Sequence, residues 1–423
     1  MRRTIYISTV LAALAVLVMA GCSDRGTNVP TRTDTFGYTW VPLSNPPFAP
    51  ELTLQRGNPN GQLKLAIWAP PQVIPGNAPA SLLLLLAPGE SSQWFYLERG
   101  LHKICNEMIA NGEIDPMVVV CVGNDEMFGG YFYGNSLPAG FYDEVIGDAL
   151  VDHLQFLYPS LINNPARRGI GGIGQGAYGA FRAAIKNPGV FTSITAVDGP
   201  LDFDGADGES GFMTLFNDVL FENGLSVATG YSRVDPARRI DSSSANPVTR
   251  MFIGGSVAFS PKDTGLVSTG QRHNSTLNII ERRQVSDTLT QISHLLTGRI
   301  SGGPIPSTEA IRFDFNLPFD STSKTHAPTW RRWMANNLDT MLVKQGGSAL
   351  DNIDIWLATT PEARYTFHDQ TVSFRDFLMD DMGLSVDTLT YMGYPGNPAH
   401  DYEYVYYLLK EMIKYHADHF RGN

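Results

Sequence analysis

The segment Gly172-Ile173-Gly174-Gln175-Gly176 has the spacing of a nucleophile elbow, but its central residue is glycine. An elbow of the form Gly-x-Ser-x-Gly turns sharply from a strand into a helix and presents a serine hydroxyl that attacks an ester carbonyl. Here the strand-like run from Gly169 is followed by the helix-like run Ala180–Pro188. Glycine relieves the strain of such a turn but supplies no attacking oxygen. The pattern indicates a site shaped for ester hydrolysis, with Gly174 in the nucleophile position.

The elements that would hold this turn alternate between strand and helix along the chain. Continuous apolar runs indicate buried strands, and apolar residues at helical spacing indicate amphipathic helices. The predicted strands are Leu63–Trp68, Ser81–Ala87, Met117–Val122, Phe191–Val197 and Ile353–Leu357, and the predicted helices are Tyr96–Ala110, Tyr142–Tyr158, Val372–Met382 and Tyr402–His416. This order predicts an α/β fold with a mainly parallel sheet and helices on both faces. Residues 201–345 are less regular, and we interpret them as a cap-like insertion with some helix near 275–297.

Five sequence pieces in one order resemble the esterase D / feruloyl-esterase family of α/β-hydrolases. They are Leu85-Leu-Ala-Pro-Gly-Glu90, the segment Gly140–Leu154, Tyr178-Gly179-Ala180, Leu317-Pro-Phe-Asp320 before Trp330 and Trp333, and Gly396-Asn-Pro-Ala-His400-Asp-Tyr-Glu-Tyr404. The resemblance extends from about residue 60 to the end and is weakest across the insertion. It implies an α/β-hydrolase fold and a carboxylic-ester site.

The resemblance also implies roles for individual residues. His400 occupies the position of the catalytic base, and Glu362 is the candidate for the carboxylate that orients it. The oxyanion donors would be the backbone N–H groups of Gly89 and Gln175, because Pro88 has no N–H to offer.

The chain departs from the family pattern at the nucleophile, at the acid and in the oxyanion loop. These departures predict a degenerate esterase that binds, rather than cleaves, a small-molecule or glycan-linked ester. The alternative is an active carboxylic-ester hydrolase with another nucleophile, for which Ser91 and Ser92 are the candidates.

Two further patterns point to other classes of site. Gly174-x-Gly176-x-x-Gly179, with Asp198 downstream, matches a dinucleotide-binding fingerprint, a less favoured alternative. The run Asp202-x-Asp204-x-x-Asp207-x-Glu209 lacks the spacing of a calcium loop, so we interpret it as an acidic turn. We therefore predict no metal and no cofactor.

The N-terminus predicts export. Arg2 and Arg3 precede an apolar run, Ile5–Val18, that is too short to span a membrane and ends in Met19-Ala-Gly-Cys22. Small residues before a cysteine resemble the bacterial lipoprotein signal, which implies cleavage before Cys22 and a lipid on its sulfur. We predict a signal peptide at 1–21, an acylated tether at 22–45 and a hydrolase domain at 46–423, lipid-anchored in the bacterial cell envelope.

Charge and cysteine content limit the possible partners. The formal charge of −11 argues against nucleic-acid binding. Apart from Cys22, the cysteines are Cys105 and Cys121, and their spacing leaves open whether they pair or stay as buried thiols.

Overall fold

The computed structural model describes most of the chain from residue 79 onward and several strands before it. The described residues are 32–33, 38–43, 51–56, 62–70, 73, 79–124, 130–136, 142–205, 211–222, 247–261, 281–284, 309–312, 316–318, 327–361, 363–391 and 405–422. Of the predicted site residues, Cys22, Glu362 and His400 lie outside these ranges.

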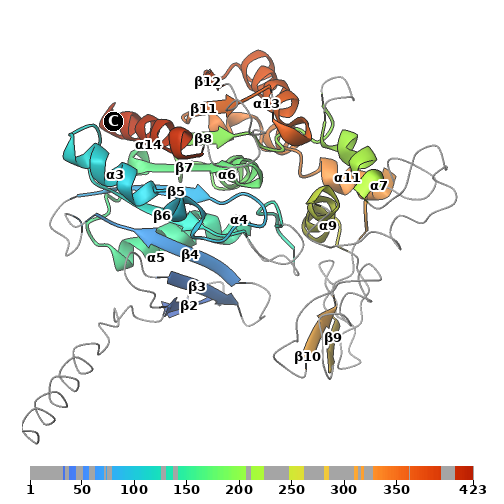
Figure 1. The fold of residues 1–423 in the computed structure, drawn as a ribbon, viewed down its shortest axis with the longest axis horizontal. Helices are drawn as coiled ribbons and strands as arrows, with labels where there is room; N and C mark the ends of the chain where they lie inside the picture. Colours follow the sequence, from blue (N-terminus) through green and yellow to red (C-terminus); the bar gives the residue numbers. More distant parts are fainter. Residues whose placement is uncertain are drawn as a thin grey trace, which may run out of the picture.

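A single large sheet forms the centre of the molecule (Figure 1). Across the sheet the strands are β1 (Arg32–Thr33), β2 (Tyr38–Leu43), β3 (Glu51–Arg56), β4 (Gln62–Trp68), β6 (Met117–Val122), β5 (Ser81–Leu86), β7 (Arg168–Ile173), β8 (Ser193–Val197), β11 (Asp354–Thr359) and β12 (Val386–Thr390). The pairs from β1 to β6 are antiparallel, and those from β6 to β12 are parallel. The carboxyl ends of the six parallel strands therefore meet at one edge.

Helices cover both faces of the sheet, as predicted. Alternate residues of a strand point to opposite faces, so an all-apolar strand presents apolar side chains on both faces, and both need to be covered. In β5, Leu82, Leu84 and Leu86 pack into one core, whereas Leu83 and Leu85 pack into the other. The first core is completed by α5 (Leu150–Leu157), α6 (Gln175–Lys186) and α13 (Phe367–Asp376), and the second by α2 (Phe95–Glu98), α3 (Leu101–Ala110) and α14 (Val405–Gly422).

Two predicted helices are interrupted, and in each a glycine lies at the break. The helix predicted at Tyr96–Ala110 is divided into α2 and α3 at Gly100, which has φ 90°. The helix predicted at Tyr142–Tyr158 begins as α4 (Tyr142–Glu144) and is kinked at Ile146 and Gly147 before α5. Glycine costs helical stability and permits backbone angles that other residues avoid, so both breaks have a local cause.

The described part of the insertion contains more helix than its sequence led us to expect. Its helices are α7 (Phe216–Glu222), α9 (Pro247–Phe259), α11 (Ala327–Met334) and α12 (Leu338–Lys344). All four contribute buried residues, and α9 is buried along nearly its whole length. Figure 1 shows α7, α9 and α11 together on the right, beyond the ends of the central strands. The helix expected near 275–297 is wrong for Glu281–Gln284, which form strand β9 and pair with β10 (Glu309–Arg312).

Aromatic side chains hold the described part of the insertion together. Phe203, Phe212, Phe252 and Trp333 are completely buried, and the Phe212 and Phe252 rings lie 4.8 Å apart between centroids. Trp333 stacks on Phe212 at 5.8 Å, and its Nε1 donates to Ser260 Oγ at 3.1 Å. Large buried rings of this kind contribute much of the hydrophobic stabilisation of a core.

Cys105 and Cys121 are both buried free thiols on the α3 face of the sheet. Burial raises the pKa of each, so both stay protonated at neutral pH. Among the described residues, no helix has the length and apolarity needed to cross a membrane.

A buried histidine should make stability depend on pH. His416 of α14 is fully buried, with Nδ1 2.8 Å from Ser193 Oγ and Nε2 3.0 Å from Thr195 Oγ1. Burial, with a smaller contribution from His419, lowers its pKa to about 3. Below an unfolded pKa of about 6.5 the unfolded chain binds a proton that the native chain does not, so stability falls as pH drops from about 6.5 towards 3.

We expect His416 to contribute a slope of up to about 1.4 kcal/mol per pH unit in that window. Urea unfolding midpoints measured at several pH values should show this dependence, and His416→Gln should reduce it. An unchanged slope in His416→Gln would assign the acid sensitivity to other groups.

Candidate active site

Gly174 lies at the apex of a sharp turn between β7 and α6. Its backbone angles are φ 58° and ψ −125°, a conformation that side-chain-bearing residues rarely adopt. The residue is buried, and its N–H donates to Val197 O of the neighbouring strand at 2.9 Å. The strand-to-helix turn predicted from the sequence is therefore present, with glycine at its apex.

The glycines on either side of Gly174 allow α6 to approach the sheet closely. A Cβ on Gly176 would lie 2.0 Å from Leu86 O, and one on Gly172 would lie 2.3 Å from Gly176 C. Real Cβ atoms do not come this close to backbone atoms, so both positions require glycine. The chain keeps the steric requirements of an elbow although the central hydroxyl is absent.

The loop after β5 runs beside the elbow. Tyr133 Oη donates to Ala87 O at 2.7 Å, and Glu90, with φ 62°, donates its N–H to Asn124 O at 3.0 Å. Since the Glu90 N–H is used inside the protein, Gly89 remains the predicted oxyanion donor from this loop. Glu90 also lies 2.5 Å from Arg250 Nε of α9, which links the loop to the insertion.

Burial raises the pKa of Glu90, and Arg250 opposes that rise. The Arg250 guanidinium thus favours the charged carboxylate in a place where desolvation disfavours it.

Asn124 and the side chain of Gln175 connect the strand ends. Gln175 Oε1 accepts from Asn124 Nδ2 at 3.0 Å and from the Phe132 N–H at 3.2 Å, while Asn124 Oδ1 accepts from the Tyr131 N–H at 3.1 Å. Both side chains are buried. Asn124 was not among the residues predicted from the sequence, although its place soon after the buried strand β6 was a usable signal. The predicted role of Gln175, as a backbone donor, is separate from this role of its side chain.

Asp198 is a buried carboxylate at the end of β8, the strand next to the elbow strand. It is 3% exposed and has φ 40°. Its Oδ1 accepts from Thr359 Oγ1 at 2.8 Å and from the Thr360 N–H at 3.2 Å, and its Oδ2 accepts from Tyr391 Oη. In the sequence, Asp198 stood out only as part of a dinucleotide fingerprint, but in the structure its oxygens accept hydrogen bonds from groups at the ends of β11 and β12.

Backbone strain is concentrated at this edge of the sheet. Among the described residues, six that are not glycine have positive φ: Glu90, Phe132, Tyr133, Asp198, Tyr365 and Thr366. All six follow the carboxyl ends of β5, β6, β8 or β11. Each such residue costs of order 1–3 kcal/mol, and such residues cluster where a protein binds or reacts. This edge is therefore the strongest candidate for a functional site in the described part of the chain.

The predicted acidic turn forms a local hydrogen-bonded structure around Asp202. Its Oδ1 accepts from the N–H groups of Asp204 and Gly205, each at 3.1 Å, and from Asn337 Nδ2 at 3.1 Å. Its Oδ2 accepts from Ser373 Oγ at 2.7 Å. Desolvation, and then the nearby Asp202, raise the pKa of Asp204. Asp202 therefore organises a turn, while Asp207 and Glu209 lie outside the described residues.

Comparison of the structure with solved structures finds esterases and related hydrolases. A ferulic acid esterase aligns over 91% of this chain and 100% of its own, with 12% identity and a TM-score of 0.50. An S-formylglutathione hydrolase from Agrobacterium tumefaciens aligns over 92% and 98%, with 13% identity and a TM-score of 0.45. One from Staphylococcus aureus aligns over 90% and 99%, with 11% identity and a TM-score of 0.47.

Neither the family models nor the curated protein sequences contain a match to this chain. The likeness is therefore one of fold. Three observations indicate the same fold: the strand order, the elbow between β7 and α6, and the alignment with the ferulic acid esterase over 91% of this chain and 100% of that one. The chain has the α/β-hydrolase fold.

In the α/β-hydrolase fold, the turn that Gly174 occupies is the one that carries the nucleophile. The strand ends around it supply the Asn124, Gln175 and Asp198 contacts described above. The predicted base and acid, His400 and Glu362, lie outside the described residues and stay predictions, as do the oxyanion roles of Gly89 and Gln175.

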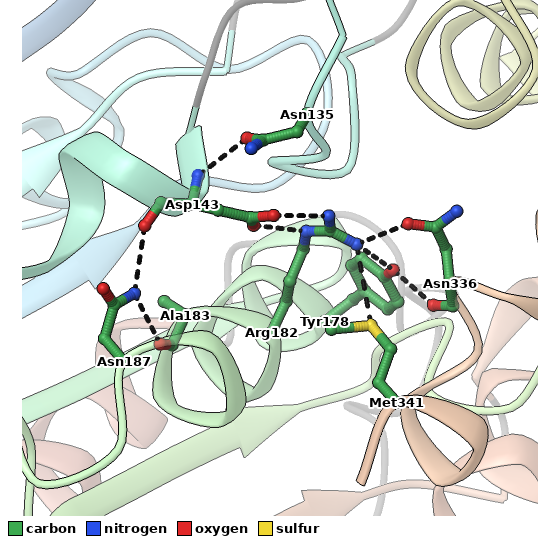
Figure 2. Close-up of polar contacts among 8 residues, drawn as sticks. All are labelled: Asn135, Asp143, Tyr178, Arg182, Ala183, Asn187, Asn336 and Met341. Atoms are coloured by element: carbon green, nitrogen blue, oxygen red, sulfur yellow. Dashed lines mark hydrogen bonds and ion pairs between the residues drawn. The ribbon is translucent and has the colours of Figure 1, made fainter. Parts of the chain in front are cut away.

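A buried ion pair fixes the helix that follows the elbow (Figure 2). Arg182 of α6 binds both oxygens of Asp143, with Nε–Oδ1 at 2.7 Å and Nη2–Oδ2 at 2.8 Å. Its Nη1 donates to Asn336 Oδ1 at 2.8 Å, and Tyr178 Oη donates to Asn336 O at 2.6 Å. The network therefore joins the elbow helix to α4 and to the segment after α11.

The charges of this network are set by their neighbours. Burial lowers the pKa of Arg182, but Asp143 and Tyr178 outweigh it and leave that pKa above its ordinary value. Burial raises the pKa of Tyr178 to about 12, so its hydroxyl stays protonated and can donate. A guanidinium that makes a bidentate ion pair with one carboxylate strongly restrains the position of α6 relative to α4.

Proposed function

We propose that this protein is a degenerate esterase that binds an ester or glycan-type ligand at the carboxyl edge of its sheet. The observation that carries the proposal is Gly174 at the apex of an otherwise intact elbow. Acyl transfer through this turn needs a hydroxyl or thiol at that position, and glycine has neither. The tight packing at Gly172 and Gly176 supports retention of the site's shape after loss of the nucleophile.

The strained loops support binding as the retained activity. Their conformations are costly, and they follow strands on both sides of the elbow strand β7 in the sheet order. A ligand held here would lie against the ends of the parallel strands, the usual place for ligands in open α/β sheets. Without an activated nucleophile, such a ligand would be bound and released unchanged.

The alternative is an active hydrolase that uses a serine outside the elbow. Ser91 and Ser92 precede α2, and Asn124 donates its N–H to Ser91 O at 2.8 Å, so this turn does lie near the strand ends. However, Ser92 Oγ accepts from the Trp94 N–H at 3.2 Å, and Ser91 Oγ donates to Gly89 O at 3.5 Å. Those bonds support structural roles in the turn.

A fluorophosphonate probe, which reacts with activated serines, tests the proposal. We expect no labelling of the wild-type protein and no hydrolysis of p-nitrophenyl acetate. In Gly174→Ser, a hydroxyl at the apex should give weak labelling and weak hydrolysis, both lost in Gly174→Ser/His400→Ala. The added Cβ at positive φ should cost of order 1–3 kcal/mol and lower the melting temperature.

The outcomes separate the two functions. Stoichiometric labelling of wild type, with the modified serine located by peptide mapping, would overturn the proposal and favour the active hydrolase. A folded Gly174→Ser variant without activity would instead show that the surrounding site cannot support acyl transfer. The protein would then have lost more of the catalytic site than the nucleophile alone.

The N-terminal sequence supports attachment to a membrane of the bacterial cell envelope through Cys22. We expect Cys22→Ala to release the protein from the membrane fraction or to leave its leader uncleaved, because the lipid would be attached covalently through the Cys22 sulfur. Fractionation and mass spectrometry of the mature N-terminus measure this. Cys105→Ala, which removes a buried thiol, is the matched control and should stay membrane-bound. A mature terminus other than a modified Cys22 would contradict the anchor.

A further inference from the structure

A histidine, a threonine and an aspartate form a continuous hydrogen-bonded chain beside the elbow. Thr359 Oγ1 lies 2.8 Å from Asp198 Oδ1 and 3.3 Å from His368 Nδ1. Thr359 ends β11, Asp198 follows β8, and His368 is the second residue of α13. The three residues therefore come from neighbouring elements at the strand ends.

The protons in this chain can be assigned from its donors and acceptors. Asp198 receives hydrogen bonds from Thr359, Thr360 and Tyr391, so its carboxylate acts as the acceptor. A hydroxyl has one proton, and Thr359 uses it toward Asp198. The bond between Thr359 and His368 then requires His368 Nδ1 to be the donor. In the neutral imidazole, this places the proton on Nδ1 and leaves a lone pair on Nε2.

The position of this chain relates it to the candidate site. A Cβ on Gly199, the residue after Asp198, would lie 2.9 Å from Gly174 O, so the Asp198 segment runs directly beside the elbow. Tyr365 and Thr366, both at positive φ, immediately precede α13. Such conformations are costly for a tyrosine and for a β-branched threonine. His368 is half-buried, whereas Asp198 and Thr359 are buried.

We propose that Asp198 and Thr359 are positioning residues that hold His368 so that its Nε2 accepts a hydrogen bond from a hydroxyl group of the ligand. An Nε2 atom without a proton can only accept a hydrogen bond, so its partner must be a donor. The Asp198 carboxylate behind it disfavours an anion, so a neutral hydroxyl-bearing ligand, such as a sugar, fits best. This inference rests on the proposed function, because it names the chemical class that the same site would bind.

Nuclear magnetic resonance of the full chain labelled with ¹⁵N-histidine tests the assignment. His368→Gln identifies the His368 signals among those of the nine histidines. In the wild type we expect the Nδ1–H form of His368. Thr359→Val removes the hydroxyl and should abolish that preference, whereas Thr359→Ser keeps the hydroxyl and should retain it. Detection of the Nε2–H form in the wild type would contradict the proposed hydrogen-bonded chain. So would an Nδ1–H form that persists unchanged in Thr359→Val.

A second measurement tests the ligand class with methyl β-D-xylopyranoside as the probe. We expect it to shift the His368 Nε2 resonance and to bind about two- to tenfold more weakly to Thr359→Val, the range for loss of one neutral hydrogen bond. Tetrahydropyran, the same ring without hydroxyls, is the matched control and should leave Nε2 unmoved. No shift with the xyloside, or an equal shift with tetrahydropyran, would overturn the ligand assignment.

These results are independent of the test of the proposed function. Serine labelling in the wild type would refute the degenerate state without changing the His368 proton position. An Nε2–H form of His368 would refute this inference and leave the degenerate state standing.

Discussion

Gly176→Ala is expected to prevent the chain from folding to a soluble native state. The new Cβ would lie 2.0 Å from Leu86 O and 2.7 Å from Leu86 C, which are backbone atoms of a central strand. Those atoms cannot move without breaking the pairing of β5 with β6 and β7. The cost should exceed the 1–3 kcal/mol that is typical of an overpacked core. Soluble yield and circular dichroism of the purified variant measure the effect.

Two other glycines provide a graded comparison. A Cβ on Gly179 would lie 2.4 Å from Tyr133 Cδ2, a side-chain atom that can shift, so Gly179→Ala should fold with reduced stability. A Cβ on Gly422, at the end of α14, meets nothing within 4 Å, so Gly422→Ala should resemble the wild type. If Gly176→Ala proved as stable as Gly422→Ala, the close approach of α6 to β5 would be wrong.

Arg182→Met should lower the free energy of unfolding by about 3–5 kcal/mol, because it leaves the Asp143 carboxylate without its cation. The side chains of Arg182 and Asp143 are 4% and 14% exposed, so water cannot replace the lost partner. The double variant Asp143→Leu/Arg182→Met removes both charges and should recover much of the loss. Urea unfolding of the single and double variants measures the coupling between the two residues.

The matched control is an arginine in a more exposed ion pair. Arg375 and Asp376 are 33% and 50% exposed, so Arg375→Met should change stability by no more than about 1 kcal/mol. Equal losses in Arg375→Met and Arg182→Met would mean that burial of the pair in Figure 2 does not determine its contribution.

Features encoded in a single stretch of residues were predictable from the sequence. The leucines of β5 and the valines of β6 alone specify strands covered on both faces, and the glycine spacing around Gly174 specifies the turn. Strand β12 was missed because it lies at the edge of the sheet and is largely exposed, so it lacks an apolar pattern. The aromatic core of the described part of the insertion was missed because its residues are far apart in sequence and meet only in the folded chain.

The contacts of Asp198 could not be predicted for a different reason. The role of a carboxylate depends on which strand ends lie beside it, and that follows from the sheet order β8–β11–β12. The sequence offered a local fingerprint instead, which led only to a dinucleotide hypothesis. The relation of Thr359 and His368 to Asp198 likewise spans more than 160 residues of chain, as the separation of 161 between Thr359 and Asp198 shows.

The aromatic cluster of the insertion has a thermodynamic consequence. Trp333 and Phe212 belong to the same contiguous core as Leu84 of the central sheet, so no solvent-filled boundary divides the insertion from the sheet at this point. Parts of a protein that share one core lose it together, whereas parts joined through a small polar interface melt separately. The described helices of the insertion and the sheet therefore form one cooperative unit. Heating should unfold them in a single calorimetric transition, in which the indole of Trp333 becomes exposed to water as the sheet unfolds.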